Sequence, residues 1–268
     1  MTDYLDQVSE FVADTAFDDL PDAAVERARR VITDTIAAIA AGSAEPEVVA
    51  LTTRMATQGG PSSVIGAARR AQPTTAAFLN GTSGTFLELD EGNQFSRGHP
   101  GIHALPSALA VAEAQRASGQ DFLTAIVLGY EIGARIGIAA KILPTMHPHG
   151  TWGTVGSAVA VAKLMGANAG QVRELINIAS TLGLATSRQT MLQGGTVRNS
   201  FAGFSGQIGI MAWEMLESGF TGEADGLSTI WGKVISTEWR PEEMTHELGS
   251  RYEIARNYFK RHACCRYN

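Results

Sequence analysis

The sequence predicts an all-α protein. Apolar residues recur at the three- and four-residue spacing of a helix along nearly the whole chain. Runs that alternate apolar and polar residues, as strands do, are scarce, and 62–66 is the best candidate. Hydrophobic residues make up 44% of the 268 residues, which is enough to bury a core. No repeat and no flexible linker divides the chain, so we expect one helical domain over 1–257.

The first predicted helices each carry a local signal. Leu5, Val8 and Val12 share one face of a helix over 2–15. Helix 20–42 has a buried stripe, with Pro21 in its first turn and Gly42 at its end. The helix over 46–58 also begins with a proline, and 104–117 is apolar on nearly all sides, which predicts burial.

The next predicted helix, over 121–142, follows a capping box formed by Ser118 and Asp121. Gly129, Gly133 and Gly137 fall on one of its faces. Each helical glycine costs about 1 kcal/mol relative to alanine, so this row predicts the close approach of another helix. The remaining predicted helices cover 153–165, 169–184, 199–218 and 226–235.

The charge pattern excludes some classes of partner. The net charge is -6, and the 21 lysines and arginines are spread along the chain, so no nucleic-acid partner is expected. The acidic start of the chain, residues 1–6, lacks the pattern of a signal peptide, and no apolar run looks long and uncharged enough to span a bilayer. The two cysteines, Cys264 and Cys265, are adjacent and ill-suited to pair. These observations predict a cytoplasmic protein with no membrane partner.

Three loops concentrate polar side chains in this alanine-rich chain. They cover residues 88–106, 146–154 and 186–199, and each leads into a predicted helix. Helix N-termini bind carboxylates or phosphates, and arginines recognise carboxylates through paired hydrogen bonds. Histidines transfer protons near neutral pH. The loops therefore predict proton chemistry on a small anion, carried by the following candidates: His99, His103, His147 and His149 as acids or bases, and Arg97, Arg188 and Arg198 as anion contacts.

Simpler interpretations stand beside these. A histidine before proline, such as His147, is often a structural hydrogen-bonding group, and Arg188 and Arg198 could lie on the surface. Histidines 147 and 149 with Cys264 and Cys265 suggest zinc, but CxxC and HExxH spacings are absent, so no metal is predicted. No phosphate-binding loop, dinucleotide fingerprint or nucleophile elbow occurs, so no cofactor is predicted.

Five segments in order carry a family resemblance. They are DTIAAIAAG (34–42), LELDE (87–91) with the later HPG (99–101), GYEIGARI (129–136), HPHGTWGT (147–154) and KRHACCRY (260–267). With them the chain resembles the MmgE/PrpD family, which includes 2-methylcitrate dehydratases, cis-aconitate decarboxylases and iminodisuccinate epimerases. The resemblance implies a large helical domain followed by a smaller α/β domain, with the active site between them. It places residues 258–268 at the start of the linker and implies that the second domain is missing from this chain.

The resemblance also implies roles for individual residues. His147, Asp90 and His99 match catalytic positions, with Glu88 as the alternative to Asp90. The implied substrate contacts are Arg198, Lys260, Glu88, Asn93, Arg97 and Cys265. Three positions depart from the family pattern. Glu91-Gly92 replaces an Asp-Thr pair, and Asn93 or Ser96 would have to replace the missing threonine hydroxyl. Phe201 stands where histidine is common, and Cys265 lies near the position of a catalytic histidine in some members.

The implied activity needs neither metal nor organic cofactor. Members of the family abstract a proton, or remove CO2, next to a carboxylate of a small di- or tricarboxylate. We therefore expect a lyase, for example a dehydratase, that acts on a polycarboxylate and forms a homodimer. Epimerisation and decarboxylation are alternatives within the family. A catalytically silent helical module for binding or oligomerisation is the alternative from another class.

Overall fold

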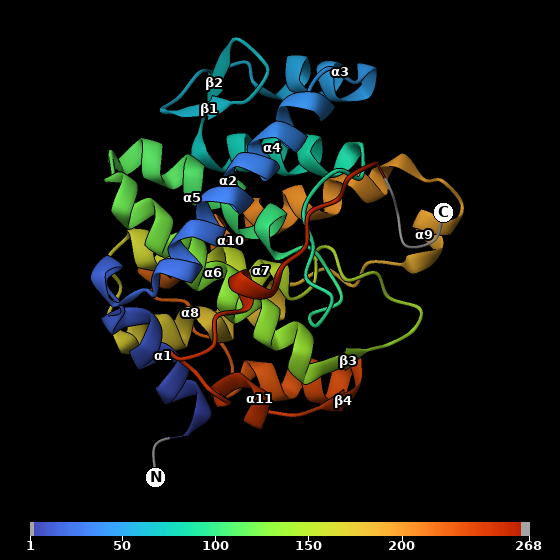
Figure 1. Ribbon diagram of the computed structural model, residues 1–268. Helices are drawn as coiled ribbons and strands as arrows, with labels where there is room; N and C mark the ends of the chain where they lie inside the picture. Colours follow the sequence, from blue (N-terminus) through green and yellow to red (C-terminus); the bar gives the residue numbers. More distant parts are fainter. Residues whose placement is uncertain (1–2, 264–268) are drawn as a thin grey trace.

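The computed structural model describes residues 3–263 and confirms the helical fold (Figure 1). The α-helices are α1 (Tyr4–Asp14), α2 (Asp22–Gly42), α3 (Pro46–Met55), α4 (Pro73–Phe86), α5 (Pro100–Gln115), α6 (Gly119–Ala139), α7 (Gly153–Leu164), α8 (Ala169–Leu182), α9 (Arg188–Leu192), α10 (Phe201–Glu217) and α11 (Glu242–Thr245). Shorter helical turns cover Phe17–Asp19, Thr196–Ser200 and Glu253–Arg256, and a π-helix covers Leu227–Val234.

Strand structure within residues 3–263 is confined to two antiparallel pairs. β1 (Ser62–Val64) pairs with β2 (Arg69–Ala71), with Ser62 opposite Ala71. This pair includes the strand predicted at 62–66. β3 (Ala140–Ile142) pairs with β4 (Ser236–Trp239), and its first residue follows directly on α6. The helix predicted over 121–142 therefore ends at Ala139, three residues early.

Helix α7 lies inside the bundle, where it packs against α5, α6, α8 and α10 (Figure 1). The predicted close helix contact is confirmed between α6 and α7. A Cβ atom on Gly129 would lie 2.6 Å from the carbonyl oxygen of Gly156. Gly137 instead receives a loop, because its Cβ would lie 2.8 Å from the carbonyl oxygen of Ser96.

Helix α4 was not predicted from the sequence. Residues Ala76 to Thr85 are all buried, so the helix has no polar face that would reveal its period. Two of its hydroxyl groups are satisfied within the helix, since Thr82 and Ser83 donate to the carbonyls of Phe78 and Leu79, both at 2.8 Å. The start of α5 was also misplaced, because the helix begins at Pro100 and not at 104.

Helix α6 corrects the expectation that no segment is long and apolar enough to cross a membrane. Its 21 residues pass that test by length and composition, and 89% of the apolar window is buried inside the fold. Its two charged residues in the interior, Glu131 and Arg135, form an ion pair of 2.7 Å. The burial identifies α6 as the central helix of the bundle.

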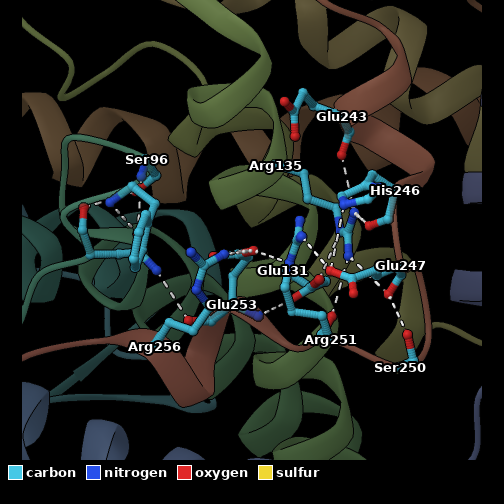
Figure 2. Close-up of polar contacts among 12 residues, drawn as sticks. Ser96, Glu131, Arg135, Glu243, His246, Glu247, Ser250, Arg251, Glu253 and Arg256 are labelled. Atoms are coloured by element: carbon cyan, nitrogen blue, oxygen red, sulfur yellow. Dashed lines mark hydrogen bonds and ion pairs between the residues drawn. The ribbon is translucent and has the colours of Figure 1, made fainter.

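A buried charged cluster attaches the segment 242–256 to α6 (Figure 2). Arg135 is fully buried and donates to the carbonyls of Glu243, His246 and Arg251 at 3.0, 2.8 and 3.2 Å. Glu131 accepts the backbone N–H of Glu253 at 2.5 Å. This cluster fixes the path of the chain just before it reaches the candidate site.

Candidate functional site

A cavity of about 630 Å³ opens where the three polar loops meet the segment 258–260. The loops were predicted from sequence to carry the chemistry, and all three contribute to its wall. The charged and imidazole side chains that line it are Glu88, Arg97, His99, His147, His149, Arg188, Arg198 and Lys260. Asn93 also lines it, Asp90 lies directly behind it, and Cys265 lies outside the described residues.

Asp90, His99 and Lys260 form a contact group at one end of the cavity. The Asp90 side chain is buried, with one oxygen 3.3 Å from Lys260 Nζ and the other 3.6 Å from His99 Nδ1. His99 Nδ1 lies closer to the backbone oxygen of Glu91, at 2.6 Å. Since a carbonyl only accepts, Nδ1 carries the hydrogen of this contact.

Glu88 and Arg198 form a second pair beside this group. The guanidinium of Arg198 contacts Glu88 Oε1, and it donates to Asn199 Oδ1 at 2.9 Å. Lys260 Nζ donates to the backbone oxygen of Glu88 at 3.0 Å and therefore joins both pairs. Glu88 has a φ of +55°, an uncommon backbone for a residue with a side chain. Both acids that the sequence offered as alternatives, Glu88 and Asp90, thus converge on the same lysine.

Three histidines surround His149, which is 1% exposed, so that four imidazoles form one cluster. The His149 ring centroid lies 4.8 Å from that of His147, 5.0 Å from His99 and 5.2 Å from His103, each in an edge-to-face arrangement. Burial, together with the charge of Arg198, lowers the pKa of His147 to about 3. Burial also lowers the pKa of His103 to about 3 and lowers that of His149. These three imidazoles are therefore neutral at neutral pH.

Asn93 and Arg97 have structural contacts in addition to their places in the cavity wall. The Asn93 side chain accepts the N–H groups of Phe95 and Ser96 at 2.9 and 3.0 Å and donates to the Glu253 carbonyl at 3.0 Å. Arg97 donates to the carbonyls of Gly137 and Ala140, both at 2.7 Å. Both side chains thus hold loop 88–99 against its neighbours, and their contact with substrate stays a prediction.

Charge in the cavity favours an anionic ligand over a metal cation. Asp90, His99 and His149 could offer three donor atoms to an ion, all within 4.8 Å of one another. Lys260 already forms an ion pair with Asp90, however, and the positive charge of Arg198 lowers the pKa of His147. A cation placed among these groups would be repelled by both side chains, whereas a carboxylate would be attracted.

Comparison with known proteins adds an independent finding. The model of the MmgE/PrpD N-terminal domain matches residues 6–241. A cis-aconitate decarboxylase-like protein, oryM, of Aspergillus oryzae is 29% identical over 96% of the chain and 58% of its own length. The cis-aconitate decarboxylase of Aspergillus terreus is 26% identical over 97% of the chain and 56% of its own length, and the Homo sapiens enzyme is 32% identical over 60% of the chain and 35% of its own length. The chain thus spans little more than half the length of the Aspergillus relatives.

Proposed function

The chain belongs to the MmgE/PrpD family. We propose that it is a lyase, or the large domain of one, that acts on a small di- or tricarboxylate of the cis-aconitate type. One observation carries the proposal: buried neutral imidazoles and two buried cations, Arg198 and Lys260, meet at one cavity. The names of the relatives support decarboxylation more than the dehydration first expected from the sequence.

Binding would use the two cations. Arg198 and Lys260 are already paired with Glu88, and Lys260 also with Asp90, so the cations are held at the cavity wall before a ligand arrives. Preorganised charges of this kind lose little conformational entropy on binding. A tricarboxylate would share them with the two acids, and its remaining carboxylate would face the histidines.

Proton transfer would fall to His147. In decarboxylation the bond between carbon and carboxylate breaks, CO2 leaves, and the electron pair that stays on carbon takes up a proton. The low pKa of His147 arises from burial and from Arg198, and a bound polyanion would oppose the second cause and favour the imidazolium. After His147 has given its proton to the product, His99 and Asp90 would supply a new proton to the histidine cluster, because both lie beside it.

Proton NMR in deuterated water tests the activity. The chain is incubated with cis-aconitate, citrate or 2-methylcitrate, and we expect one deuterium to enter the product as CO2 is lost. Substitution His147→Gln should slow turnover by about 10²- to 10⁴-fold, the usual contribution of a general acid or base. His246→Gln is the matched control, because the His246 side chain is 60% exposed and does not line the cavity.

The same spectra separate the alternatives. Exchange of a substrate proton without loss of CO2 would favour epimerisation, and loss of water would favour dehydration. Absence of both exchange and turnover for every acid would contradict the enzymatic proposal, and the silent helical module would then be preferred. Equal turnover by wild type and His147→Gln would exclude His147 as the proton-transfer group.

A further inference from the structure

Glu91 lies behind the cavity wall, and the sequence marked it only as a departure from the family pattern. We propose that Glu91 is a positioning residue that acts as a neutral carboxylic acid and holds His99 and Asp90 at the cavity. The positioning role rests on the proposed function of that cavity. The protonation state of Glu91 does not, and it can be measured without any substrate.

Both backbone polar groups of Glu91 form hydrogen bonds to side chains. Its carbonyl accepts the His99 Nδ1 hydrogen at 2.6 Å, and its N–H donates to Asp34 on α2. Asp90 precedes it directly, so the peptide that carries Asp90 is fixed by the same contacts. A shift of Glu91 would therefore move both the ring of His99 and the carboxylate of Asp90.

The side chain of Glu91 is fully buried and joins three elements. Oε1 accepts the N–H of Gly101 in the first turn of α5 at 2.7 Å. Oε2 lies 3.0 Å from the Tyr130 hydroxyl on α6 and 3.5 Å from Asn257 Nδ2, three residues before Lys260. Glu91 is thus the point at which α5, α6 and the lysine-bearing segment meet behind the cavity.

The hydrogen-bond partners of the Glu91 carboxyl, Gly101, Tyr130 and Asn257, are all neutral groups. The Asn257 contact of 3.5 Å is long, and Asn257 Oδ1 is buried with no hydrogen-bond partner within residues 3–263. The two ends of an amide are assigned from the hydrogen-bond network, and turning this amide would place Oδ1 against Glu91. A carboxylate cannot donate to that oxygen, but a carboxylic acid can. A proton on Glu91 is therefore compatible with this contact when the amide is turned, and Nδ2 then takes the place in which Oδ1 has no partner.

Burial and the charge of a neighbour also favour the protonated form of Glu91. Burial raises the pKa of Glu91 to about 8, and the charge of Asp90 adds to this, against the hydrogen bonds from Gly101 and Tyr130. The other titratable groups around it are Asp34 from α2, His103 from α5, Tyr130 from α6, and Glu253 and Lys260 from the C-terminal segment. Lys260 is paired with Asp90 and Glu88 and makes no ion pair with Glu91.

Infrared spectroscopy in deuterated water is the direct test. We expect the wild-type chain to show the carbonyl band of a protonated carboxyl group at neutral pH, and this band should disappear around pH 8. The band that disappears around pH 8 should be absent from Glu91→Gln and retained in Asp34→Asn and Glu131→Gln. These two controls are needed because burial also raises the pKa of Asp34 and raises that of Glu131 to about 7. Absence of the band in wild type, or its retention in Glu91→Gln, would overturn the proposal.

Unfolding by urea across the pH range gives a second readout. The folded pKa of Glu91 is raised, so its contribution to stability is present in acid and is lost as pH rises towards about 8. Glutamine cannot ionise, so Glu91→Gln should lack this part of the pH dependence. Identical pH dependence in the two proteins would contradict a neutral Glu91.

Positioning itself is tested through ligand affinity and turnover. Glu91→Gln keeps the shape of the side chain and its neutral charge. At neutral pH, its Kd for cis-aconitate and its kcat should therefore stay within about threefold of wild type. Wild type should lose kcat above pH 8 as Glu91 ionises, and this loss should be absent from Glu91→Gln. Glu91→Ala should lower kcat at least about tenfold through the misplaced His99. If Gln and Ala variants lose kcat equally, the neutral-acid role is wrong. If wild type turns over no acid, the proposed function fails, and the infrared test still decides the state of Glu91.

Discussion

At the residue scale, the site depends on charges that are buried in opposed pairs. Arg198 is 6% exposed, and its partner Glu88 also faces the cavity. Removal of the guanidinium would leave the Glu88 carboxylate near any incoming acid. Affinity for a polycarboxylate should therefore fall both through the lost contact and through the new repulsion.

Arg198→Ala is expected to weaken binding of cis-aconitate by about 10- to 100-fold, which corresponds to a lost charged hydrogen bond of about 1.5–3 kcal/mol. Arg198→Lys should lose less, because it keeps the charge but not the paired geometry. Isothermal titration calorimetry measures both. Arg30→Ala is the control, since Arg30 forms an exposed pair with Glu26 on α2. Unchanged affinity in Arg198→Ala would exclude Arg198 as a substrate contact.

Several of these residues were predictable and others were not. Loops 88–106, 146–154 and 186–199 were recognisable because their side chains are polar within an alanine-rich chain, and the structure brings them to one cavity. His149 and Glu91 could not be ranked in advance. Their roles depend on burial and on neighbours from other elements, such as Tyr130 and Asn257, which no local pattern specifies.

At the element scale, most long helices were predicted, including the buried α7, whereas α4 was missed. The stripe of α2 and the capping box of α6 are local signals, and both are present in the structure. Helix α4 lacks such a signal, because its buried hydroxyl groups bond to its own carbonyls. The predicted helix at 226–235 is instead a π-helix over Leu227–Val234, a distinction that helical spacing does not make.

Helix α6 offers a matched pair of glycine substitutions. Gly129→Ala should destabilise the chain by about 1–3 kcal/mol, since the new methyl group would lie 2.6 Å from a backbone oxygen of α7. Gly119→Ala, at the exposed first position of the same helix, has no atom within 4 Å of the new methyl group and should be neutral or stabilising by up to about 1 kcal/mol. Urea unfolding compares the two. Equal effects would show that the contact between α6 and α7 does not limit stability.

At the scale of the whole molecule, the site is assembled from segments that are far apart in the sequence. Lys260 contacts Glu88 and Asp90 from about two-thirds of the chain away. Its position depends on the segment 242–256, which Arg135 and Glu131 hold against α6 (Figure 2). The sequence placed Glu131 and Arg135 on a helix but could not show that they anchor a distant segment.

Arg135→Met tests whether this buried cluster supports the site. It leaves the Glu131 carboxyl, whose pKa burial already raises to about 7, without its cation, and it leaves several carbonyls without a donor, so we expect a loss of about 3–5 kcal/mol. Hydrogen exchange followed by mass spectrometry should show a larger increase in exchange rate, relative to wild type, in 242–257 than in α7, which lies inside the bundle.

The double variant Glu131→Gln/Arg135→Met separates charge from geometry. It removes both charges, so it should recover part of the lost stability if the unpaired Glu131 causes most of the cost. Exchange in 242–257 should nevertheless remain fast, because the Arg135 bonds to the carbonyls of Glu243 and His246 are still missing. Weaker cis-aconitate binding by both variants would then connect the cluster to Lys260. If exchange rises evenly over the whole chain, the cluster stabilises the fold in general and does not hold this segment in particular.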